Sequence, residues 1–77
     1  MADRHASVEA VLQFFTYEHL PPHLAEVSKP IANLAHGMAD NLGTSPELTL
    51  GLRKLLEAKD CFVRQAVLDK QKEDGNG

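Results

Sequence analysis

The sequence contains one cysteine and no tryptophan in 77 residues, and no run of apolar residues long enough to cross a membrane. A single thiol cannot form an intrachain disulfide, and a free thiol is typical of a reducing compartment. The first residues also lack the apolar segment of a signal peptide. The net charge of −3 argues against coating duplex nucleic acid. We therefore expect a cytoplasmic protein without membrane or duplex nucleic-acid partners.

A chain of this length has room for one core only. Cores of this size rarely contribute more than about 3–5 kcal/mol, and small proteins compensate with disulfides, a metal ion or a partner chain. His19 and His23 stand four apart, but Pro21 and Pro22 between them keep them off a common helical face, and no carboxylate or cysteine completes a ligand set. The sequence therefore predicts a homo-oligomer without metal or cofactor.

Three segments show the apolar periodicity of helices, at about 7–16, 22–42 and 45–69. They predict an all-α fold, in which a short N-terminal helix precedes an antiparallel two-helix hairpin. Residues 1–6 are expected to form a flexible N-terminus, and residues 70–77 a disordered polar tail. The whole chain is then one helical domain.

The turn between the second and third helices has the clearest local signals. Gly43 is expected to adopt the left-handed conformation that ends a helix. Thr44 and Glu47 have the spacing of a capping box, and Pro46 suits a first helical turn. Because the stop and start signals are nearly contiguous, the two helices are expected to double back on one another.

The second predicted helix carries an apolar stripe with a proline inside it. Pro30 either kinks a continuous helix or lies in the first turn of a helix that begins near Lys29 with Ser28 as its cap, and we favour the kink. The stripe is expected to pack against the third helix. It consists of Leu24, Val27, Ile31, Leu34, Met38 and Leu42.

The third predicted helix has an apolar surface wider than one partner helix can cover. Its excess width is a second reason to expect self-association. Cys61 lies between the two stripes of this surface and is predicted to be buried and inert. One stripe is Leu48, Leu52, Leu55, Phe62 and Ala66, and the other is Leu56, Val63 and Val67.

Few residues have the chemistry of a ligand site. Tyr17 lies at the predicted break between helices, where its ring could stack on a base. The cations of the third helix suit phosphates. They also suit an exposed helix face with ion pairs between residues four apart, Arg53–Glu57 and Asp60–Arg64. No nucleophile with an orienting base is evident, so we expect a protein that is not an enzyme.

Several motifs follow one another along the chain in an order that can be compared with known families. They are Phe15-Thr16-Tyr17, a loop with prolines, an apolar helix, a short turn and a run from Glu47 to Ala58. Over roughly residues 14–68 this order resembles the helical-hairpin domain of phage anti-CBASS and anti-Thoeris nucleotide sponges. In the third helix the matching positions are Glu47, Lys54, Leu55, Glu57 and Ala58. The Lys29-Pro30 step and the Leu20-Pro21-Pro22 loop depart from the family pattern.

The resemblance implies a homo-oligomer, typically a hexamer, in the host bacterial cytoplasm. Such a sponge binds cyclic oligonucleotides or cyclised ADP-ribose without cleaving them and so blocks anti-phage signalling. The resemblance also implies that Tyr17 stacks on a base and that Lys54 contacts a phosphate. Lys29, Arg53 and Arg64 are further candidates for phosphate contact because they are cations, although they match no position of the family pattern. The alternative is a small helical interaction protein or inhibitor that offers its apolar helix face to a host protein.

Overall fold

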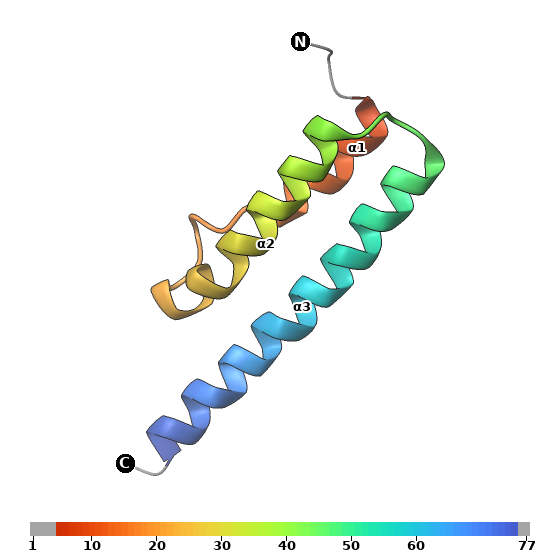
Figure 1. Ribbon diagram of the computed structural model, residues 1–77. Helices are drawn as coiled ribbons and strands as arrows, with labels where there is room; N and C mark the ends of the chain where they lie inside the picture. The colour runs from red at the N-terminus through yellow and green to blue at the C-terminus, as the bar shows by residue number, and fades with distance from the viewer. Residues whose placement is uncertain (1–4, 76–77) are drawn as a thin grey trace.

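The computed structural model describes residues 5–75, and every regular element in this range is helical (Figure 1). Helix α1 (Ala6–Leu12) continues into a 3-10 turn, η1 (Gln13–Phe15). Two longer helices follow, α2 (Pro22–Asn41) and α3 (Pro46–Gly75). The predicted all-α class is confirmed.

The two long helices lie side by side and run in opposite directions, with α1 packed near the end where they connect (Figure 1). Helix α3 is half as long again as α2, with 30 residues against 20, and it extends past the beginning of α2. The described chain is therefore elongated, with dimensions of 51 × 20 × 16 Å.

The core lies between α1 with η1 on one side and the two long helices on the other. Helix α2 contributes only small side chains to it, so that α1 and Phe15 can approach its backbone closely. Lys59 of α3 fixes this arrangement, because its Nζ donates to the carbonyl oxygen of Phe14 at 3.1 Å. The buried residues are Val8, Val11, Leu12 and Phe15, then Ser28, Ala32 and Ala35 of α2, and Leu48 and Leu52 of α3.

The predicted apolar stripe of α2 is buried only in part, because its first half, Leu24, Val27 and Ile31, is half-buried. Leu34, Met38 and Leu42 are exposed, whereas the small residues one helical position further round are buried. On α3, Phe62 and Cys61 are also exposed rather than buried. The physical reason is that α1 packs against the small-residue face, which turns the larger side chains of α2 outward.

At both ends of the domain the helices extend further than predicted. Helix α3 continues through residues 70–75, because no helix breaker precedes Gly75 and polar pairs span successive turns, Gln65 with Asp69 at 2.8 Å and Lys70 with Asp74 at 3.8 Å. At the other end, His5 is the N-cap of α1 and Ala6 its first residue. Residues 1–4 and 76–77 of the predicted flexible ends lie outside the described residues.

The connection between α2 and α3 differs from the predicted caps. Gly43 does not have a positive φ, and α2 ends instead through an extended Leu42 with φ −112° and ψ 151°. The carbonyl oxygen of Ser45 accepts from the amides of Leu48 and Thr49, so Ser45 rather than Thr44 precedes the helix and the capping box is out of register. Helix α2 is continuous through Pro30, so it does not begin near Lys29 with Ser28 as its cap.

Leu52 is expected to be essential for stability. Its side chain is 2% exposed, so Leu52→Ala should lower the free energy of unfolding by about 2–5 kcal/mol, through lost burial and a residual cavity. Leu50→Ala is the matched control, because Leu50 lies on the same helix and is 46% exposed. Urea denaturation followed by circular dichroism measures both. Equal losses for the two variants would contradict the described core.

Ser28 is expected to be replaceable with a gain in stability. Its hydroxyl is buried and has no hydrogen-bond partner among residues 5–75. Ser28→Ala should raise the free energy of unfolding by about 1 kcal/mol, because it removes an unpaired polar group and adds a better helix former. A lower urea midpoint for this variant would show that the hydroxyl has a partner in solution.

Candidate functional site

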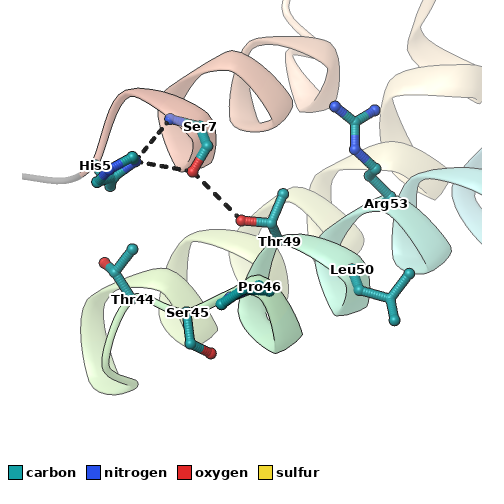
Figure 2. Close-up of a pocket in the computed structure, with 8 residues that line it drawn as sticks. All are labelled: His5, Ser7, Thr44, Ser45, Pro46, Thr49, Leu50 and Arg53. Carbon is teal, nitrogen blue, oxygen red and sulfur yellow. Dashed lines mark hydrogen bonds between the residues drawn. The ribbon is translucent and has the colours of Figure 1, made fainter.

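A pocket of about 660 Å³ lies where the beginning of α1 meets the α2–α3 connection and the first turns of α3 (Figure 2). Two stretches of the chain form it, residues 5–7 and 44–53. The exposed surface of its lining is mainly apolar, and hydroxyl groups, an imidazole and a guanidinium are placed around it. The lining residues are His5, Ser7, Thr44, Ser45, Pro46, Thr49, Leu50 and Arg53.

Hydrogen bonds link three of these side chains across the pocket wall. The Ser7 amide donates to Nδ1 of His5 at 3.1 Å, and the Ser7 hydroxyl lies 2.9 Å from the same nitrogen. The Ser7 hydroxyl is also 3.5 Å from that of Thr49 (Figure 2). The network therefore joins the first turn of α1 to the first turn of α3 and positions the pocket hydroxyls.

The His5–Ser7 contact has the length of a nucleophile–base pair, but its geometry is that of a helix cap. Nδ1 of His5 already accepts the Ser7 amide, which is the usual role of an N-cap side chain. The two residues are neighbours along the chain, so their proximity follows from the turn itself. The contact is explained by capping and gives no independent indication of catalysis.

The pocket is chemically suited to an anion. Hydroxyl groups can donate hydrogen bonds, and the Arg53 guanidinium lies at one side of the pocket (Figure 2). The beginning of α3 adds the positive end of a helix dipole. Phosphate and carboxylate groups are the ligands that such donors recognise best, and arginine can bind them with two parallel hydrogen bonds.

Of the five residues predicted for the site, Arg53 alone lines this pocket. Lys54 is exposed on α3, about 100° further round the helix. Lys29 is exposed on α2, and Tyr17 is half-buried against the core. Arg64 is exposed three turns along α3, where its Nη2 donates to Sγ of Cys61 at 3.6 Å. One chain does not bring the five together.

The predicted ion pairs on α3 are not the observed ones. Asp60 pairs with its neighbour Lys59, with Nζ and Oδ1 3.2 Å apart, rather than with Arg64. Lys59 is also largely buried, whereas the sequence pattern placed it with the other cations on an exposed helix face. Its position among the apolar residues of α3, three or four residues from Leu56 and Val63, could have indicated an anchoring role.

The loop that carries Tyr17 is held by its neighbour Glu18. One carboxylate oxygen of Glu18 accepts the Tyr17 amide at 3.1 Å, and the Tyr17 carbonyl accepts the Leu20 amide at 3.0 Å. The pKa of Glu18 is lowered because the backbone amides of Glu18 itself and of Tyr17 donate to the charged carboxylate. This local network holds the backbone at Tyr17.

Two further observations concern cofactors and membranes. Within residues 5–75, no three or more histidine, cysteine, aspartate or glutamate side chains are grouped so as to hold a metal ion. In the same range, no helix combines the length and apolar character needed to cross a membrane. Comparisons with protein-family models, curated proteins and solved structures gave no match to this chain.

Proposed function

We propose that this protein is a phage-type sponge, a homo-oligomer that binds cyclic nucleotide immune signals and holds them without cleavage. The observation that supports it best is the pocket around Arg53, which has hydroxyl donors, one permanent cation and a volume of about 660 Å³. Pockets for small molecules commonly measure about 300–1,000 Å³. The pocket is therefore large enough for a phosphorylated nucleotide and has donors for its phosphates.

Sequestration requires affinity but no reacting group. A ligand held by hydroxyl groups and a guanidinium keeps its phosphodiester bonds unless a nucleophile is activated beside them. The only His–Ser contact in the pocket has a structural explanation as a helix cap. These features favour a binding protein over an enzyme.

A neighbouring subunit supplies the remaining predicted residues to the proposed site. Base stacking needs an aromatic ring, and the only tyrosine, Tyr17, does not line the pocket of its own chain. The proposed site is therefore completed between subunits, with Tyr17 against a base and Lys54, Lys29 or Arg64 against phosphates. In this proposal the antiparallel α2–α3 hairpin is the repeating unit of a homo-oligomer, most simply a hexamer.

Self-association is also favoured by the modest core. Within the described residues, the core consists of eight apolar side chains, two of which are alanines. Several large apolar side chains remain exposed on α2 and α3. A single chain of this kind gains little from its own packing, and burial of the exposed side chains against other subunits would add the missing stabilisation.

The purified protein is expected to retain a cyclic nucleotide and to release it intact. Native mass spectrometry with a panel of cyclic dinucleotides, cyclic trinucleotides and cyclised ADP-ribose isomers should show one ligand class bound at fixed stoichiometry to an oligomer. Heat denaturation should then return that ligand unchanged. Recovery of a linear or hydrolysed product would favour an enzyme. An oligomer that binds no member of the panel would favour the alternative, an inhibitor that binds a host protein through its apolar helix face.

Arg53 is expected to contribute directly to affinity. Arg53→Ala should weaken binding of the retained ligand at least tenfold, about 1.4 kcal/mol, because a charge-assisted pair to phosphate is lost. Lys72→Ala, an exposed cation near the end of the same helix, is the matched control and should change the dissociation constant less than twofold. Isothermal titration calorimetry measures both. Tyr17→Leu and Lys54→Ala should also weaken binding, and parental affinity in both would confine the site to one chain.

A further inference from the structure

A second hollow in the surface lies between the two long helices and is apolar. This groove measures about 310 Å³, and none of its lining comes from α1. On the α2 side it is bounded by Leu34, Met38 and Leu42, the exposed part of the stripe that was predicted to be buried. The lining residues are Leu34, Met38, Leu42, Glu47, Leu48, Gly51, Leu52 and Leu55.

The α3 side of the groove continues as a stripe along that helix. Gly51, Leu55, Ala58 and Phe62 follow at intervals of four, three and four residues, so they lie on one helical face. Phe62 is 57% exposed and projects from this face beyond the groove. The stripe therefore has a hollow at Gly51 and a protruding ring at Phe62, about three turns apart.

We propose that a second copy of this chain occupies the groove, with the two α3 helices packed antiparallel. The spacing of four, three and four reads the same in both directions, so one register superposes the stripe on itself. In that register Phe62 of each copy packs on Gly51 of the other, and Leu55 packs on Ala58. Each large side chain then meets a small one, which is the condition for close helix packing.

Gly51 leaves space for an external partner, as the other described glycines also do, and it is the one that lines the groove. A Cβ atom at this position would meet nothing within 4 Å, so packing inside one chain does not require glycine there. Glycine is also one of the poorest helix formers, and α3 is continuous around it. An aromatic ring from a second copy, seated on the bare backbone, gives this glycine a packing role.

The molecule is large enough to carry a dimer interface of ordinary size. The two long dimensions of the whole described chain, 51 and 20 Å, bound one side of it at an area on the order of 1,000 Å², and stable interfaces bury about 800 Å² on each partner. A two-fold axis uses the same patch on both copies, as the palindromic stripe requires. The inference assigns the face for the self-association in the proposed function, but it is independent of any ligand.

A charged substitution on the α3 stripe tests whether this face forms the dimer. Phe62→Lys should weaken self-association at least tenfold in sedimentation equilibrium, because it places a charge in the apolar contact. Leu68→Lys is the matched control, since Leu68 lies on the same helix, is 56% exposed and is off the stripe. It should associate like the parent. A parent chain that is monomeric at millimolar concentration, or equal association of both variants, would overturn the proposal.

A pair of opposite charges tests the antiparallel register of the two α3 helices, because it should restore association that each single variant loses. Gly51→Glu should weaken association as Phe62→Lys does, whereas Gly37→Glu, at another open helical glycine outside the groove, should not. The double variant Gly51→Glu/Phe62→Lys should associate at least threefold more tightly than either single variant, because each glutamate then faces a lysine of the second copy. Positions 51 and 62 are too far apart to pair within one helix. Absence of rescue would exclude the antiparallel register, and ligand retention measured on the same samples reports separately on the sponge.

Discussion

The fold depends on the small side chains along one face of α2. Ser28, Ala32 and Ala35 allow Phe15 and α1 to pack close to the α2 backbone, and larger residues there would hold α1 away from α3. With that face in the core, Leu34, Met38 and Leu42 on the adjoining face are left exposed. The apolar groove is thus a direct consequence of how the core is assembled.

Sequence periodicity predicted the helices well but misidentified the buried face of α2. Hydrophobicity rules rank leucine and methionine above alanine, so the stripe through Leu34 and Met38 gave the stronger signal. Alanine and serine carry little hydrophobic weight, yet their small size decides where a third helix can approach. The length of α3 was missed for a related reason, since a polar segment without a breaker is compatible with both helix and coil until its pairs, such as Lys70 with Asp74, are known.

The candidate site was predictable only in part. Arg53 can bind an anion wherever it lies, so its residue type alone made it a candidate, and it lines the pocket. The contact between Ser7 and Thr49 joins residues 42 positions apart, and no local pattern links them. His5 acquires its role only because α1 begins at Ala6. Residues that reach a site only through tertiary contacts are therefore the hardest to predict from a single sequence.

The pocket and the groove use the same turns of α3 but different faces. Arg53 follows Gly51 by two residues, which places the two side-chain positions about 200° apart around the helix. A second copy seated in the groove would therefore leave the pocket open. An isologous contact closes at two subunits, so a hexamer requires a second kind of interface. The face that carries the pocket remains available for it, and an interface there is where Tyr17 and Lys54 of a neighbour would reach a ligand held by Arg53.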